Sequence, residues 1–143
     1  MLARDTISHA IRKARDSGRP GIVAYLTAGF PTKDSFAKNL QAVVSAADVI
    51  EIGVPFSDPM ADGTTIQRAN EVALRGGVRL ENCIAEGEAL VAERDATVML
   101  MGYLNPFLRY GAERLAADCV RTGIAGVIVP DLPAEESAEL DTV

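Results

Sequence analysis

The sequence predicts an α/β fold with a parallel sheet of the (β/α) TIM-barrel type, a half barrel in which only about the first four β/α units are present. Three observations lead to this prediction. Short apolar runs alternate with stretches of helical periodicity, as in folds built from repeated βα units. The apolar runs are nearly continuous, which is typical of buried parallel strands. Unusual polar residues follow these runs directly, and barrels carry their chemistry on the loops after their strands.

The predicted elements follow one another without a linker or low-complexity segment. A leading helix has its apolar residues on one face and ends at Gly18. Four strand-like runs come next, each leading into a turn or loop, at residues 21–31, 49–54, 97–103 and 126–133. Helical stripes separate them, at residues 36–44, 66–77, 80–91 and 115–119, and a last helix opens within residues 133–140.

The first turn argues against a doubly wound sheet, the other common parallel arrangement. Such a sheet usually carries GxGxxG or GxxxxGKS after its first strand, whereas this chain has TAGFPT. A complete barrel needs about 250 residues, and the chain has 143 and stops at ELDTV, early in its last helix. We therefore expect residues 1–143 to be the N-terminal half of a single (β/α)₈-barrel domain, truncated, with two unpaired sheet edges.

Composition excludes several classes of partner. The net charge is −6, the pI is about 4.8, and Lys and Arg are scattered, so no basic stripe offers a nucleic-acid site. No apolar run approaches the roughly 20 residues of a membrane span, and the N-terminus lacks the apolar stretch of a signal peptide. We expect a cytoplasmic protein with neither nucleic acid nor membrane as a partner.

The few residues suited to metal or nucleophilic chemistry have a simpler interpretation. Cys83 and Cys119 lie far apart, without CxxC spacing, each on the apolar face of a predicted helix. Reduced thiols in the core are therefore expected. His9, the single histidine, lies on the charged N-terminal helix, where a zinc site or a Ser-His-Asp triad is not expected.

An acidic residue interrupts the second predicted strand, VIEIGV. Side chains alternate faces along a strand, so the β-branched residues face the helices and Glu51 faces the barrel interior, near the carboxyl end of the strand. Partial desolvation there raises the pKa of a carboxyl and suits it to proton transfer near neutral pH. Gly53 leaves space beside the Glu51 side chain. The alternative is a structural glutamate paired with an arginine or with backbone N–H groups.

The loop after this strand, PFSDPMADGTT, carries two further acids. Pro55 and Pro59 fix φ and stiffen it. Asp62 lies close enough to the following helix, TTIQRAN, to cap its N-terminus, where negative charge is favourable. Pattern alone favours this capping interpretation over a functional one.

Four segments, taken together, resemble one family. EIGVPFSDPMADGTTIQRAN (51–70) closely resembles the signature segment of the tryptophan synthase alpha chain family. YLTAGFP (25–31), MGYLNP (101–106) and GVIVPDLPAEES (126–137) resemble its first, third and fourth strands with their exits. Order and spacing agree along essentially all of the chain, and the resemblance covers the first half of a full-length alpha chain.

The resemblance implies an activity. The family is a lyase of tryptophan biosynthesis that cleaves indole-3-glycerol phosphate to indole and glyceraldehyde 3-phosphate by a retro-aldol reaction, without a metal or organic cofactor. Glu51 matches the catalytic glutamate, which protonates C3 of the indole and helps deprotonate the glycerol hydroxyl. Asp62 matches the aspartate that hydrogen-bonds the indole N–H, where a carboxylate stabilises the charge that develops in the transition state.

The resemblance also implies substrate and partner contacts. Tyr25, Met101 and Ile128 match positions that line the indole pocket, and all are apolar or aromatic, as a flat ring requires; barrel-core filling is their alternative role. Tyr103 matches a further substrate-binding position, and Asn105 a motif position near the site. The loop with Asp58 and Pro59 would face a tryptophan synthase beta chain, in an α2β2 heterotetramer.

Two departures from the family pattern leave alternatives open. Thr64 stands where the family often has proline, which makes the loop less stiff. The loops after strands 7 and 8, which bind substrate phosphate in barrels, lie outside this sequence. The second hypothesis is therefore an inactive half barrel, prone to self-association or to binding partners through its edges. A third, another phosphate-sugar barrel enzyme such as an epimerase, is disfavoured by the long EIGVPFSDP match.

Overall fold

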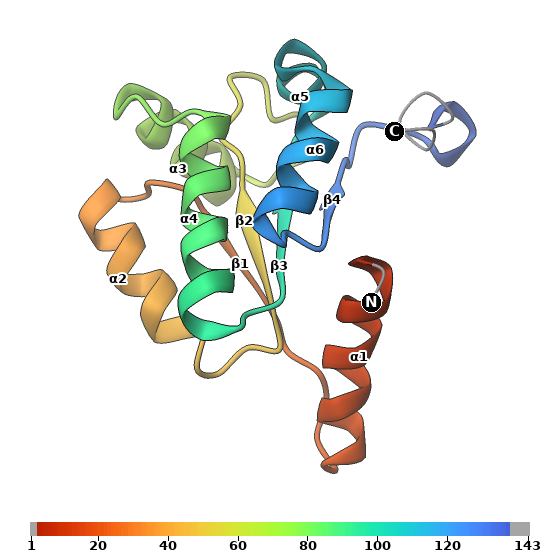
Figure 1. Cartoon of the computed structure of the whole chain (residues 1–143). Coiled ribbons are helices and arrows are strands. Elements are labelled where there is room, and N and C mark those ends of the chain that lie inside the picture. Colours follow the sequence, from red (N-terminus) through yellow and green to blue (C-terminus); the bar gives the residue numbers. More distant parts are fainter. Residues whose placement is uncertain (1–2, 138–143) are drawn as a thin grey trace.

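Four parallel strands form one sheet at the centre of the molecule (Figure 1). The computed structural model describes residues 3–137. The strands are β1 (Val23–Thr27), β2 (Val49–Gly53), β3 (Val98–Met101) and β4 (Gly126–Ile128). Each pairs only with strands next to it in sequence, in the order β1-β2-β3-β4. A doubly wound sheet would reverse direction from its first strand, so this order confirms the predicted half barrel.

Three helices cover one face of this sheet. They are α2 (Lys33–Val43), α4 (Leu80–Arg94) and α6 (Ala112–Thr122). Ile50 and Ile52 of β2, with Leu100 of β3, point into this layer and are at most 1% exposed. Burying such a side chain contributes about 1.5–3 kcal/mol to stability. The predicted alternation along VIEIGV is confirmed, with the β-branched residues packed under the helices.

The opposite face carries the residues between these core positions. One row across the sheet joins Tyr25, Glu51 and Met99, which are partners in register. The next row, two residues nearer the carboxyl ends, contains Thr27, Gly53, Met101 and Ile128. Because side chains two residues apart share a face, both rows lie on the face away from the helix layer.

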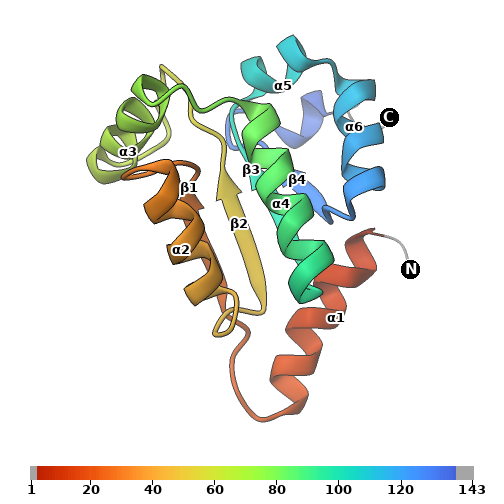
Figure 2. The same ribbon diagram turned by 60° about the vertical axis from the view of Figure 1, so that its left-hand side comes forward.

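The two ends of the strands carry different helices (Figure 2). Helix α1 (Ala3–Asp16) lies at the amino-terminal ends, where Ile11 packs on Gly21 just before β1 and Ile7 lies near Gly126 at the start of β4. Helices α3 (Thr64–Arg75) and α5 (Leu104–Tyr110) lie at the carboxyl ends. The connections after β2 and β3 are thus elaborated at the end where barrels place their sites.

Helix α5 is absent from the sequence-based prediction. Its sequence, LNPFLRY, is short and contains Pro106, which usually signals a break. Pro106 occupies the first turn, where a backbone N–H has no partner within the helix, so proline costs little there. Phe107 is 1% exposed and anchors the helix to the core. The third strand therefore ends at Met101 instead of continuing to residue 103.

The C-terminal prediction is tested only in part. The fourth strand is shorter than expected and ends at Ile128, and the 3₁₀ helix η1 (Ala134–Glu136) follows it. The remainder of the helix predicted within residues 133–140 lies outside the described residues from 138 onward.

The cysteines and the histidine occupy the environments expected for structural residues. Cys83 in α4 is fully buried, Cys119 in α6 is half-buried, and both are free thiols, as predicted. His9 is exposed on α1. Within residues 3–137 no group of three His, Cys, Asp or Glu side chains is placed to hold a metal ion. No helix in that range has the length and apolar character to cross a membrane.

Candidate functional site

Candidate residues from all four strands lie on the open face of the sheet. Tyr25 of β1 is the register partner of Glu51 of β2, and Met101 of β3 is the partner of Ile128 of β4. All four are half-buried. Side chains two residues apart share a face of a sheet, so the row of Tyr25 and Glu51 and the row of Met101 and Ile128 follow one another on the open face.

Glu51 is a carboxyl group in a partly desolvated environment without a counter-charge. Within residues 3–137 its carboxylate forms no hydrogen bond or ion pair, so the alternative of a glutamate paired with an arginine is not supported there. Burial alone raises the pKa of Glu51. A raised pKa is the kind of shift that suits a carboxyl group to general acid–base chemistry.

Gly53 has a different role from the one expected. A Cβ atom at this position would overlap the hydroxyl group of Tyr25. The space beside Glu51 is therefore filled by the Tyr25 ring, whose hydroxyl lies 3.2 Å from Oγ1 of Thr27. Burial raises the pKa of Tyr25, the Thr27 hydrogen bond opposes that rise, and the charge of Asp62 adds to it. The Asp62 carboxylate thus lies close enough to act on Tyr25.

Asp62 does not cap helix α3. The N-cap is Gly63, which has no side-chain hydrogen bond, so the capping interpretation is wrong. The Asp62 carboxylate instead accepts a long hydrogen bond from Nδ2 of Asn70, at 3.5 Å. Its charge also raises the pKa of Tyr103, after the larger effect of burial. A hydrogen bond between the Asp62 side chain and Tyr103 acts in the same direction on that pKa.

Tyr103 supports the loop that carries Asp62. Only 5% exposed, it stands directly before α5, stacks on Phe56 with ring centroids 5.2 Å apart, and accepts a hydrogen bond from the Ala61 N–H at 2.9 Å. These contacts place it beneath the loop. Whether it also contacts substrate stays a prediction.

Asn70 is a residue that the sequence interpretation missed. It is 2% exposed and its side chain binds three groups in α3 and the preceding loop. The available signal was its place on the apolar stripe of IQRANEVAL, four residues after Ile66 and three before Ala73. A polar residue at a buried helical position needs hydrogen-bond partners, and here they come from the candidate site.

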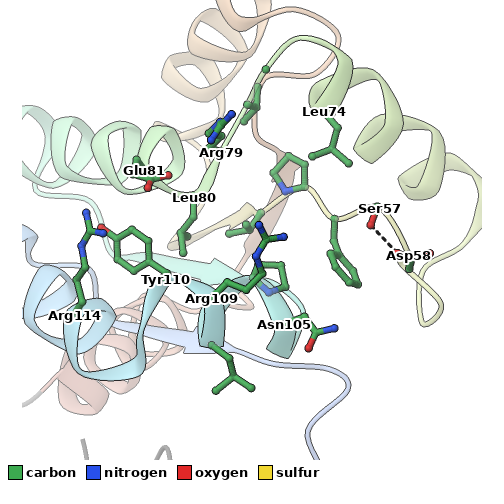
Figure 3. Close-up of a pocket in the computed structure, with 17 residues that line it drawn as sticks. Ser57, Asp58, Leu74, Arg79, Leu80, Glu81, Asn105, Arg109, Tyr110 and Arg114 are labelled. Carbon is green, nitrogen blue, oxygen red and sulfur yellow. Dashed lines mark hydrogen bonds between the residues drawn. The ribbon is translucent and has the colours of Figure 1, made fainter.

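A separate groove lies on the far side of this loop (Figure 3). Its volume is about 1060 Å³, and its walls come from residues 54–58, the turn between α3 and α4, and helix α5. Asp58, which accepts a hydrogen bond from the Ser57 hydroxyl at 2.6 Å, and Asn105 line it, whereas Glu51 and Asp62 do not. Three arginines are also in its lining: Arg79, Arg109 and Arg114. Figure 3 shows Arg114 beside Tyr110, with its guanidinium 4.1 Å from the ring centroid.

Comparison with known sequences gives one consistent family. The family model described as "Tryptophan synthase alpha chain" matches residues 11–143. The tryptophan synthase alpha chain of Nitratidesulfovibrio vulgaris (strain Hildenborough) is 46% identical over 140 residues, which is 97% of this chain and 54% of that protein. That of Roseiflexus castenholzii is 50% identical over 136 residues, or 93% of this chain and 52% of that protein.

Solved structures agree with the sequence matches. Tryptophan synthase from M. tuberculosis, in its aminoacrylate-bound form, gives a TM-score of 0.89 at 38% identity, over 94% of this chain and 55% of that one. The alpha subunit from Legionella pneumophila strain Paris gives 0.90 at 35% identity, over 96% and 53%. The chain thus spans about half the length of the relatives that it matches. On this evidence the chain belongs to the tryptophan synthase alpha chain family.

Proposed function

We propose that this chain forms the first half of a single barrel domain whose activity is the retro-aldol cleavage of indole-3-glycerol phosphate to indole and glyceraldehyde 3-phosphate. One observation carries the proposal beyond family membership. Glu51, at the position of the family's catalytic glutamate, is a half-buried carboxyl without a partner in the described chain, and burial raises its pKa. A group with these properties is suited to give a proton and take one back near neutral pH.

Glu51 moves the protons of the reaction. Its carboxyl group donates a proton to C3 of the indole ring, which leaves positive charge on the ring nitrogen. The bond between C3 and the glycerol carbon then breaks, and its electron pair restores the aromatic ring. The hydroxyl on that carbon becomes the aldehyde as its proton passes to the Glu51 carboxylate. Atoms and charge balance, and Glu51 regains its starting state.

Asp62 stabilises the charge that this step creates. Its carboxylate accepts a hydrogen bond from the ring N–H, and that interaction strengthens as the nitrogen becomes positive. Tyr25, Met101 and Ile128 provide half-buried surface on the open face, which fits a flat aromatic ring. The substrate phosphate binds at loops that follow later strands of the barrel, in the part of the relatives that this chain does not span.

The proposal is tested by indole release from indole-3-glycerol phosphate, compared between the unmodified protein and Glu51→Gln. The amide cannot transfer the proton, so we expect turnover to fall by about 100-fold or more. Glu86→Gln is the matched control. Glu86 is also half-buried with its pKa raised by burial, but it lies on α4 beside Lys33 and Phe36 of α2.

Two results would contradict the proposal. Unchanged turnover in Glu51→Gln would remove the catalytic assignment. Equal losses in Glu51→Gln and Glu86→Gln would mean that the loss reflects altered folding rather than chemistry at the open face.

We further propose that the groove beside Asp58 contacts a tryptophan synthase beta chain. Arg79 and Arg109 line this groove and form no ion pair within residues 3–137, so their charges are available to carboxylates of a partner. Arg109→Glu is expected to weaken beta-chain binding about tenfold or more in a calorimetric titration. Arg75→Glu reverses a charge on exposed α3 outside the groove lining and serves as control. Equal affinity of both variants and the unmodified protein would exclude the groove.

A further inference from the structure

Asn70 carries more hydrogen bonds than a helix residue at its position needs. Its Oδ1 accepts the backbone N–H of Phe56 at 3.1 Å. Its Nδ2 donates to the carbonyl of Ile66 at 3.0 Å and to Oδ2 of Asp62 at 3.5 Å. One buried amide thus joins helix α3 to both the beginning and the end of the loop between β2 and α3.

Packing does not account for an amide at this position. Asn70 is 2% exposed, and its neighbours on the same face, Ala69 and Ala73, are at most 3% exposed. Burying an amide is unfavourable unless its polar atoms are paired, so an apolar residue would suit a purely structural stripe. The amide binds the loop backbone and a carboxylate, which indicates a role in positioning these two groups.

Other contacts hold the backbone of the loop, and one of the residues that make them, Tyr103, also interacts with the Asp62 side chain. Gln67 Nε2 donates to the carbonyl of Asp62 at 3.0 Å, and the Asp62 N–H donates to the carbonyl of Pro59 at 3.1 Å. The Tyr103 hydroxyl accepts the N–H of Ala61 at 2.9 Å and also forms a hydrogen bond with the Asp62 side chain. The Asn70 amide donates a hydrogen bond to the Asp62 carboxylate as well, from helix α3.

We infer that Asn70 is a positioning residue for Asp62, an inference that rests on the proposed function. By donating to Oδ2, the amide restrains the rotation of the carboxylate that accepts the indole N–H. The same amide binds Phe56 N–H, so one residue of α3 holds both the Asp62 carboxylate and the start of the loop. Hydrogen bonds of this kind are often long without substrate and shorten in the complex.

The decisive variant is Asn70→Asp. The carboxylate keeps an acceptor for Phe56 N–H but loses the donor to Asp62. We expect kcat for indole release to fall about 10- to 100-fold, because misplacing a reacting group costs this much, while KM changes less than about threefold, since the phosphate supplies much of the ground-state binding. Asn70→Ser, which keeps a donor and an acceptor on a shorter side chain, should restore part of the loss.

Gln67→Glu is the matched control, because it makes the same amide-to-carboxylate change on the same helix and removes a donor to two backbone carbonyls of the loop, those of Pro59 and Asp62. Its kcat should stay within about twofold of the unmodified protein. Equal losses in Asn70→Asp and Gln67→Glu would overturn the inference, as would an unchanged kcat in Asn70→Asp.

A spectroscopic readout separates this inference from the proposed activity. The side-chain NH₂ resonances of Asn70 should shift in Asp62→Asn and remain in place in Asp58→Asn, whether or not the protein turns over substrate. Loss of activity in every sample, with that shift present, would contradict the proposed function but keep the contact. Absence of the shift would contradict the positioning role even in an active protein. If Asn70→Asp does not fold, the kcat of Asn70→Ser and the Asn70 NH₂ shift in Asp62→Asn test the inference instead.

Discussion

Two carboxylates only three residues apart in sequence, one just before β2 and one at its centre, lie in opposite environments. Asp48, just before the strand, binds Arg19 through two hydrogen bonds of 2.7 Å and accepts the Ile22 N–H at 2.8 Å. The Arg19 hydrogen bond, followed by that of Ile22, lowers the pKa of Asp48 to about 2. Glu51, within the strand, has no such partner among residues 3–137, and burial raises its pKa.

The difference separates stability from function within one strand. The ion pair of Arg19 and Asp48, at the amino-terminal ends of the strands, joins the segment before β1 to the residue before β2 and stabilises the folded state. The unpaired carboxyl on the open face costs stability, since a partly desolvated charge is unfavourable. This division matches the general pattern in barrels, whose sites lie at the carboxyl ends of the strands while the other end serves stability.

The largest effect on stability in this comparison should come from removing the paired acid. Asp48→Asn removes the charge that two guanidinium N–H groups and a backbone N–H bind, so we expect a clearly lower Tm by thermal denaturation. Indole release per folded molecule should be unchanged, because Asp48 lies at the opposite end of the strand. A loss of kcat at full folding would break the proposed separation of roles.

The pH dependence of unfolding should also reveal the contribution of the Arg19–Asp48 pair to stability. The pKa of Asp48 is about 2 in the folded state and about 3.9 in an unfolded chain, so the folded state binds the proton less readily. The stability that the pair contributes is therefore complete above about pH 4 and is lost as the pH falls toward 2. Denaturant titrations should show a weaker decline over this interval in Asp48→Asn. Identical slopes in both proteins would contradict the pairing.

The smallest effect should come from Glu51→Gln, and it should have the opposite sign. Because the folded-state pKa of Glu51 is raised, its ionised form opposes folding above that pKa, and the cost disappears as the group takes up a proton. We expect a Tm equal to or slightly above that of the unmodified protein at pH 7, with the difference vanishing toward pH 4. A clear decrease in Tm at pH 7 would assign Glu51 a structural role.

Sequence patterns predicted the parts of the molecule that depend on local periodicity. The alternation in VIEIGV placed Glu51 on the face away from the helices, and the structure confirms this through the buried Ile50 and Ile52. The strands that carry Tyr25, Met101 and Ile128 were likewise predicted, because continuous apolar runs are a strong signal of parallel strands.

The loops were less predictable because long-range contacts decide their conformation. Helix α5 depends on Phe107 reaching the core, which outweighs the break that Asn-Pro suggests. The Asp62 carboxylate accepts a hydrogen bond from Asn70, eight residues later. Local preference favoured an N-cap, but a buried amide supplied a competing partner.

The consecutive order of the strands bears on how the chain acquires its structure during synthesis. Every ladder in the sheet joins neighbours along the polypeptide, so each new βα unit adds to a surface that already exists. Closing short segments costs less entropy than closing long ones, and topologies with nearby pairings form faster. We therefore expect this sheet to assemble stepwise from its N-terminal side as the nascent polypeptide leaves the ribosome.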